Sequence, residues 1–85
     1  MISRSVTIQN SQGLHARPAT FFIQKANSFK SSIWVEKEDY RVNAKSLLGV
    51  LSLGIVKGTE ITLIADGADE EEAVAALVAL IENEL

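Results

Sequence analysis

Ile33-Trp34-Val35-Glu36-Lys37-Glu38-Asp39-Tyr40-Arg41-Val42-Asn43, residues 33–43, is the stretch from which the fold can be worked out. On each side of its centre, residues alternate between two faces: Ile33 and Val35 against their neighbours, then Tyr40 and Val42 against theirs. A period of two is typical of a β-strand with one buried face. The stretch therefore predicts a two-stranded hairpin that turns at Glu38-Asp39.

Towards the amino end, the sequence predicts a helix and, before it, a strand. From Pro18 onward apolar residues recur at helical spacing as far as Ala26, and the helix should end near Asn27-Ser28. Proline suits the first turn of a helix because it has no N–H to leave unpaired there. Residues 2–8 alternate with a period of two, and the polar run 10–13 breaks that strand from the helix.

Towards the carboxyl end, the pattern predicts a short helix, a strand and a longer helix. Ser46 is a suitable N-cap for a helix over 47–53, which Gly54 would stop. A strand containing Ile61, Leu63 and Ala65 follows a turn at Lys57-Gly58. Asp69, with Glu72 three residues later, predicts a capping box at the start of the last helix. The apolar stripe of that helix is Val74, Leu77, Val78 and Ile81.

The order of these elements, βαββαβα, predicts an α+β fold. We expect an open-faced two-layer sandwich in which three helices cover one face of a four-stranded antiparallel sheet. No linker, repeat or low-complexity segment interrupts the pattern, so residues 1–85 are expected to form one domain.

Composition excludes several classes of function. The chain has 85 residues, of which 47% are hydrophobic and 22% charged, as in an ordinary globular domain. It has no cysteine and one histidine, so no metal site, disulfide or cofactor is expected. No signal segment or apolar stretch of about 18 residues occurs, which predicts a cytoplasmic protein that does not insert into membranes.

The net charge of −3 conceals an uneven distribution. Residues 1–59 hold eight bases and three acids, a net of +5, whereas residues 60–85 hold eight acids and no base, a net of −8. A basic face could steer an acidic or phosphorylated partner. Lysine and arginine are too sparse for a nucleic-acid interface, so no direct nucleic-acid contact is expected.

The segment Gly13-Leu14-His15-Ala16-Arg17-Pro18-Ala19 carries the candidate chemistry. His15 falls at the predicted helix start, where the N–H groups of Ala16 and Arg17 lack helical partners and form a natural anion site. Arg17 adds a fork of donors for phosphate oxygens. These features suggest a phosphorylatable histidine, while the plainer alternative is that His15 only caps the helix and Arg17 is a solvated side chain.

The surroundings of His15 in the sequence favour a carrier over an enzyme that completes its own reaction. No acid lies within twenty residues of His15 to hold a metal or activate an acceptor, and there is no glycine-rich phosphate loop. A histidine, an arginine and a helix end can accept a phosphoryl group and hand it on.

Ser46 and the helix after it each have two interpretations. Ser46 could serve only as an N-cap, or also as a phosphorylation site beside Lys45, and the two roles are compatible. The apolar residues of the short helix cannot all face inward. Some should therefore be exposed, either incidentally or as a docking surface for other proteins.

Two segments, Gly13–Ala19 and Ala44–Gly54, closely resemble the signature segments of the HPr family, the histidine-containing phosphocarriers of the bacterial sugar phosphotransferase system. The resemblance extends over the whole chain. It implies that enzyme I, charged by phosphoenolpyruvate, phosphorylates His15 on Nδ1 to give pros-phosphohistidine. The group then passes to the A domain of a sugar-specific enzyme II. Arg17 matches the arginine that stabilises the phosphate, and the protein would be a phosphorylated carrier and not a free-standing enzyme.

The resemblance also assigns regulatory and contact residues. Ser46 matches a regulatory serine on which a kinase/phosphorylase acts, and its phosphorylated form would assist a catabolite-control repressor. The positions that match docking residues are Leu47, Leu48 and Leu51, with Lys45 beside them. Phosphate contacts are expected from Ala16, Arg17 and Gln12. Gln12 stands where relatives commonly have serine or asparagine, and its amide can still donate a hydrogen bond.

Two rival functions remain alongside the carrier. One is a purely regulatory HPr-like corepressor that acts through phosphorylated Ser46; a paralogue of that kind lacks the histidine, which this chain has. The other is a small ligand-binding α+β domain, although so small a core leaves little room for a pocket of about 300 Å³. A carrier that visits several partners is expected to be a monomer.

Overall fold

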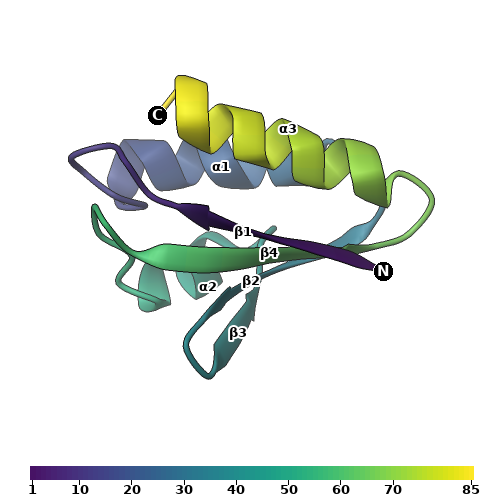
Figure 1. Ribbon diagram of the computed structural model, residues 1–85, viewed down its shortest axis with the longest axis horizontal. Coiled ribbons are helices and arrows are strands. Elements are labelled where there is room, and N and C mark those ends of the chain that lie inside the picture. The colour runs from purple at the N-terminus through teal and green to yellow at the C-terminus, as the bar shows by residue number, and fades with distance from the viewer.

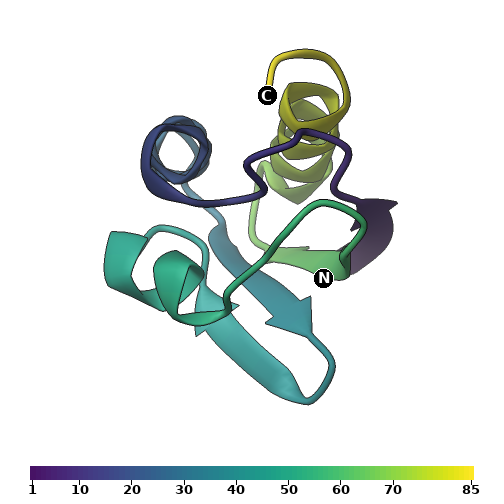
Figure 2. The ribbon, with the colours of Figure 1, turned by 90° about the vertical axis from the view of Figure 1, so that its left-hand side faces the viewer.

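The computed structural model describes residues 1–85, and its element order is the expected βαββαβα. The elements are β1 (Ile2–Thr7), α1 (Ala16–Asn27), β2 (Ser32–Lys37), β3 (Tyr40–Asn43), α2 (Leu47–Ser52), β4 (Glu60–Asp66) and α3 (Glu70–Asn83) (Figure 1). The four strands form one sheet in the order β1-β4-β2-β3, with every neighbouring pair antiparallel. The three helices lie on one side of this twisted sheet (Figure 2). The predicted fold class is therefore confirmed.

The hairpin turns where the alternation predicts. Lys37 pairs with Tyr40, which leaves Glu38 and Asp39 as a two-residue turn between β2 and β3. Glu38 adopts a φ of +55°, the left-handed conformation that short hairpin turns need. The turn forms without glycine, since the strands on each side fix the register.

The core lies between the sheet and the α1 and α3 layer. Alternate residues of the two central strands face the helices, and Phe22 of α1 and Leu77 of α3 close over them without exposed surface. The buried strand residues on this face are Ile33, Val35, Ile61, Leu63 and Ala65. Ile64, on the opposite face of β4, is also buried. The period-two pattern of the sequence thus identifies the buried face of the sheet.

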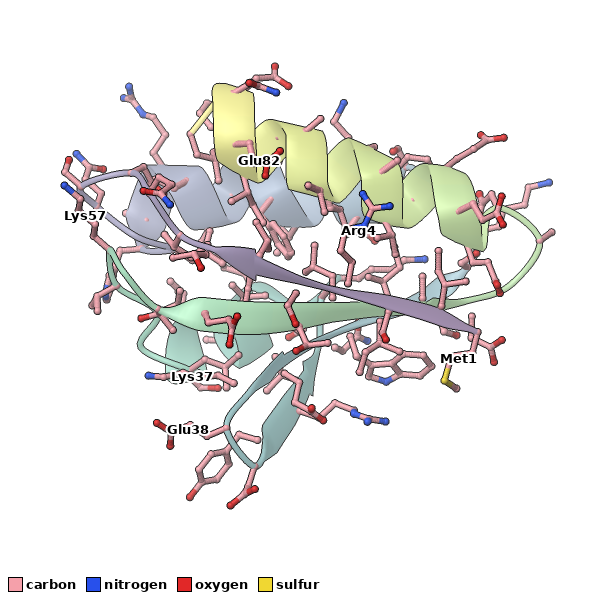
Figure 3. All side chains as sticks on the ribbon, viewed as in Figure 1. Met1, Arg4, Lys37, Glu38, Lys57 and Glu82 are labelled. Carbon is pink, nitrogen blue, oxygen red and sulfur yellow. The ribbon has the colours of Figure 1, made fainter.

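The edge strand β1 departs from its alternation at one position. Val6 is buried, and Ile8 just beyond the strand is too, but Arg4 is exposed although it shares their spacing. Figure 3 places the Arg4 side chain in front of α3, at the open edge of the sheet. An edge strand lets a long cationic side chain reach solvent from the core face.

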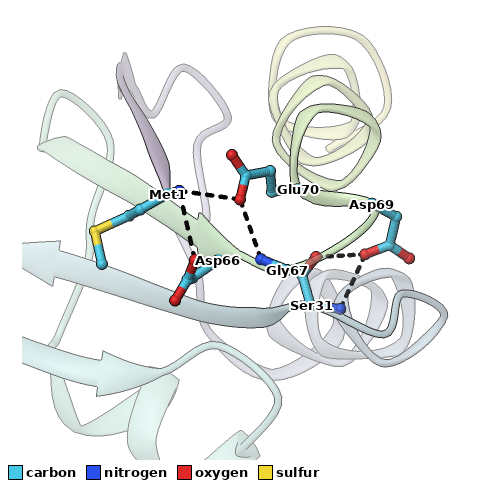
Figure 4. Close-up of polar contacts among 6 residues, drawn as sticks. All are labelled: Met1, Ser31, Asp66, Gly67, Asp69 and Glu70. Carbon is cyan, nitrogen blue, oxygen red and sulfur yellow. Dashed lines mark hydrogen bonds and ion pairs between the residues drawn. The ribbon is translucent and has the colours of Figure 1, made fainter.

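The predicted capping box at α3 is wrong. The Asp69 side chain makes no cap; its carboxylate accepts the N–H of Lys30 at 2.9 Å. It also accepts the N–H of Ser31, at 2.9 Å, and the Ser31 hydroxyl (Figure 4). These bonds, with that from the Ser31 hydroxyl the strongest, lower the pKa of Asp69 from 3.8 to about 2. Asp69 therefore connects the start of α3 to the loop that follows α1.

Glu70, the first residue of α3, bonds to the loop before the helix and to the chain's amino end. Its carboxylate accepts the N–H of Gly67 at 3.1 Å and lies 3.1 Å from the amino group of Met1 (Figure 4). The first strand, the end of β4 and the first turn of α3 are thus joined by one carboxylate. None of the three helices is long and apolar enough to cross a lipid bilayer.

Candidate functional site at the amino end of the first helix

His15 is the N-cap residue of α1, and its side chain is free. Its backbone is extended, with φ −107° and ψ 154°, and its imidazole makes no capping hydrogen bond. The residue is exposed. The alternative in which the His15 side chain caps the helix is therefore not what the structure has.

Two backbone N–H groups directly after His15 lack partners within the helix. The first intrahelical bond runs from the N–H of Ala19 to the carbonyl of His15 at 3.4 Å, and Pro18 has no N–H. The N–H groups of Ala16 and Arg17 come before this bond, so they have no acceptor within the helix. With the positive end of the helix dipole, they form an anion site next to His15.

Ala16 holds a strained backbone conformation directly after His15. Its φ is +42°, in the left-handed region, which costs an alanine about 1–2 kcal/mol. Strain of this kind persists only where the surrounding structure imposes it, and it is concentrated at functional sites. Nothing in the residue type signals it, so the sequence could not predict this feature.

The segment before His15 is anchored to the loop after α2. Leu14 is 1% exposed, and its N–H donates to the carbonyl of Ile55 at 3.0 Å. Gly13 has a φ of +61°, and a Cβ atom there would lie 2.3 Å from the oxygen of Ile55. Asn10 closes the turn by donating from Nδ2 to the carbonyl of Gly13 at 2.8 Å. An exposed histidine is thus carried on a rigid segment.

Arg17 and Gln12, two and three residues from His15 in the sequence, have no partners within the protein. Both are exposed; Arg17 is in none of the ion pairs, and neither side chain makes a hydrogen bond. Gln12 lines a hollow of about 300 Å³ beside Pro18 and the last residue, Leu85. Their side chains are therefore available for an added group at His15.

Ser46 caps α2 as predicted. Its hydroxyl accepts the N–H of Gly49 at 3.1 Å, and the residue is half-buried. The helix that follows exposes part of its apolar surface: Leu48 is 81% exposed and Leu47 37%, whereas Val50 is buried. The prediction that these residues cannot all face inward is confirmed. Leu51, which completes the expected docking set, is half-buried.

Lys45 is placed differently from a solvated cation. It is half-buried, and its ammonium group donates to the carbonyl of Phe29 at 2.8 Å. Its own carbonyl accepts Nδ2 of Asn27 at 3.3 Å. Sequence reasoning missed this contact because Phe29 and Lys45 are 16 residues apart.

The hollows of the surface do not include the residues proposed to be phosphorylated. The most prominent, of about 520 Å³, lies between α1 and α3 and includes the half-exposed Phe21 and the buried Leu80. None of the five hollows includes His15, Arg17 or Ser46. This arrangement favours chemistry on an exposed side chain over binding in an enclosed pocket.

Comparison with known proteins identifies relatives over almost the whole chain. The family model described as "PTS HPr component phosphorylation site" matches residues 2–83. The HPr-like protein Crh of Halalkalibacterium halodurans is 50% identical over 84 residues, which are 99% of this chain and 100% of that protein. Phosphocarrier protein HPr of Neisseria meningitidis is 52% identical over 81 residues, covering 95% of this chain and 91% of that protein.

Solved structures give the same result for the fold. HPr from Thermoanaerobacter tengcongensis superposes with a TM-score of 0.95 at 54% identity, over 96% of this chain and 92% of that one. Crh from Bacillus subtilis superposes with a TM-score of 0.79 at 46% identity, over 100% of this chain and 98% of that one. The Crh crystal structure is a domain-swapped dimer, which bears against the expectation of a monomer.

Proposed function

Because the chain belongs to the HPr family of the bacterial phosphotransferase system, we propose that it carries a phosphoryl group on His15. The group would come from phosphorylated enzyme I and pass to the A domain of a sugar-specific enzyme II. The observation that supports this most strongly is the exposed, uncapped imidazole of His15 beside the free N–H groups of Ala16 and Arg17. The chain would act as a carrier and not as a free-standing enzyme.

The transfer itself makes modest demands on the protein. As the bond between phosphorus and the donor breaks, a lone pair of Nδ1 of His15 forms the new nitrogen–phosphorus bond, and the second transfer reverses these roles. The phosphoryl oxygens would accept hydrogen bonds from the N–H groups of Ala16 and Arg17. The Arg17 guanidinium and the amide of Gln12 supply further donors.

Regulation would act through Ser46. A kinase/phosphorylase would add the phosphate, and the modified protein would assist a catabolite-control repressor. Ser46 lies at the start of α2, directly before the exposed Leu47 and Leu48 that would dock partner proteins. A phosphate there adds about −1.5 to −2 charge to that surface.

A purely regulatory role is the second candidate, because one relative of 50% identity is named an HPr-like protein and not a phosphocarrier. Such a protein would act through Ser46 alone. The presence of His15 in its exposed position favours the carrier.

Labelling with enzyme I and phosphoenolpyruvate separates the two functions. Wild type and Ser46→Ala should each gain one acid-labile, base-stable phosphate, and His15→Ala should gain none. Equal labelling of His15→Ala would overturn the assignment of the site. If wild type gains no label while an ATP-dependent kinase phosphorylates Ser46, the purely regulatory function is correct.

The edge strand β1 bears on the oligomeric state of the protein. We infer that this chain forms a swapped dimer as well as a monomer, because β1 is an edge strand that pairs only with β4 and could pair with β4 of a second copy. Sedimentation at increasing concentration measures the two species, and a monomer at every concentration would contradict the inference. We place the protein in the cytoplasm as one domain over residues 1–85.

A further inference from the structure

We propose that Lys45 is a positioning residue. It holds the Ser46 cap of α2 against the carboxyl end of α1, and its ammonium group is therefore committed within the molecule. Lys45 would then be neither a free docking cation nor the counter-ion of a phosphate on Ser46. The proposal rests on the proposed function only in treating Ser46 as a modified residue.

Lys45 and the end of α1 are joined by hydrogen bonds in both directions. Nζ of Lys45 donates to the carbonyl of Phe29 at 2.8 Å, two residues beyond the end of the helix. In the other direction, Nδ2 of Asn27 donates to the carbonyl of Lys45 at 3.3 Å and to that of Ile23 at 2.9 Å. A lysine near a helix carboxyl end is also favoured by the negative end of the helix dipole.

Contacts with β3 and α2 fix the same segment from the other side. The N–H of Lys45 donates to Oδ1 of Asn43 at 2.8 Å, and the N–H of Ser46 donates to the Asn43 carbonyl at 3.1 Å. Ser46 in turn accepts the N–H of Gly49 through its hydroxyl and that of Val50 through its carbonyl. Loss of the Lys45 hydrogen bond should therefore destabilise the first turn of α2.

The hydrogen bonds separate the Lys45 ammonium from the Ser46 hydroxyl. Lys45 lies in a turn, and Ser46 after it is extended, with φ −106° and ψ 119°. The Lys45 side chain reaches the loop after α1, while the Ser46 hydroxyl bonds within α2. No acidic side chain forms an ion pair with Lys45, so nothing in the protein competes with Phe29 for its ammonium group.

Amide hydrogen exchange tests the positioning role. Lys45→Met keeps the aliphatic chain and removes the donor, so exchange at Gly49 and Val50 should accelerate by roughly fivefold or more relative to Leu63 in β4. Lys45→Arg should recover part of that protection. The matched control is Lys30→Met, since the Lys30 side chain is exposed and makes no hydrogen bond. The proposal fails if exchange at Gly49 and Val50 is as slow in Lys45→Met as in Lys30→Met. It also fails if Lys45→Met accelerates exchange at all amides equally.

A chain prepared with phosphoserine at position 46 tests whether the Lys45 ammonium group stays on Phe29 or moves to the phosphate. The observable is the NMR coupling through the hydrogen bond between Nζ of Lys45 and the carbonyl carbon of Phe29. It should persist after phosphorylation, and its loss would mean that the ammonium group moves to the phosphate. Neither measurement uses enzyme I, so the failure of this proposal is distinguishable from failure of the carrier function.

Discussion

At the scale of single residues, the position of His15 depends on a backbone contact two residues earlier. Gly13 and Gly54 both have left-handed φ values, +61° and +59°, but only Gly13 touches other backbone. A Cβ at position 13 would meet the oxygen of Ile55 at 2.3 Å, whereas one at position 54 would meet nothing within 4 Å. Substituting alanine at Gly54 therefore introduces conformational strain alone, whereas substituting it at Gly13 introduces the same strain and a steric collision.

Gly13→Ala should destabilise the protein far more than Gly54→Ala. The left-handed conformation costs alanine about 1–2 kcal/mol at either position. The collision with Ile55 should add about 1–3 kcal/mol at position 13 alone. Urea unfolding of both variants measures the difference, and equal losses would show that the loop after α2 moves aside freely.

The candidate site shows which single-residue features a sequence can reveal. His15 and Arg17 were predictable, because a histidine and an arginine at a helix start are unusual and chemically suited to phosphate. The left-handed φ of Ala16 was not, since alanine disfavours it. Leu14 before it and Ala19 after it are both buried, so the position of this segment depends on tertiary packing that the local sequence does not reveal.

At the scale of elements, Asp69 joins α3 to the loop between α1 and β2. Its carboxylate is the acceptor for three donors from Lys30 and Ser31, 39 and 38 residues away. These donors favour the ionised form, so its pKa falls from the ordinary 3.8 to about 2. Stability from this link is fully present above pH 3.8 and is lost as the pH falls towards 2.

Asp69→Asn should therefore have a lower free energy of unfolding than wild type at neutral pH. The difference between the two should narrow as the pH falls from about 5 to 2. The measurement is urea unfolding across that range. Ser31→Ala removes the leading cause of the lowered pKa of Asp69. In the Ser31→Ala background, replacing Asp69 by Asn should therefore lower the free energy of unfolding by less, and that loss should depend less on pH. A gap between wild type and Asp69→Asn that stays constant over this range would contradict the link.

The elements themselves were largely predictable, because period-two and helical patterns in the sequence identify buried faces. The hairpin at Glu38-Asp39 followed from alternation alone. The capping box at Asp69 failed for a physical reason: a local pattern suggested a local partner, but Ser31 and Lys30 supply better donors from across the fold. The Lys45 contact with Phe29 escaped prediction for the same reason.

At the scale of the whole molecule, α1 packs against α2, with His15 at the amino end of α1 and Ser46 beside its carboxyl end. The helix that begins at His15 and the helix capped by Ser46 lie on the same side of the sheet (Figure 2). A charge added at Ser46 therefore enters the surface at which partners of His15 would dock. Repulsion of an acidic partner would follow.

Ser46→Asp should slow the phosphorylation of His15 by enzyme I at low salt. We expect roughly a fivefold decrease, the effect of about 1 kcal/mol of repulsion, and it should shrink as salt is added. Ser46→Asn is the control, because asparagine and aspartate cap helices equally well and differ in charge. Equal initial rates for the two variants at low salt would rule out the electrostatic mechanism.

The pairing of the first strand with β4 also constrains the order of events during synthesis. Ile2 lies opposite Ala65, and Thr7 opposite Glu60, so β1 has no strand partner until most of the chain has been made. At roughly 5–20 residues per second, the ribosome leaves this strand waiting for several seconds. During that interval β2 and β3 can already pair with each other, because they are contiguous. The order of synthesis therefore allows the β2–β3 hairpin to form first, whereas β1, the first strand made, has to wait for β4.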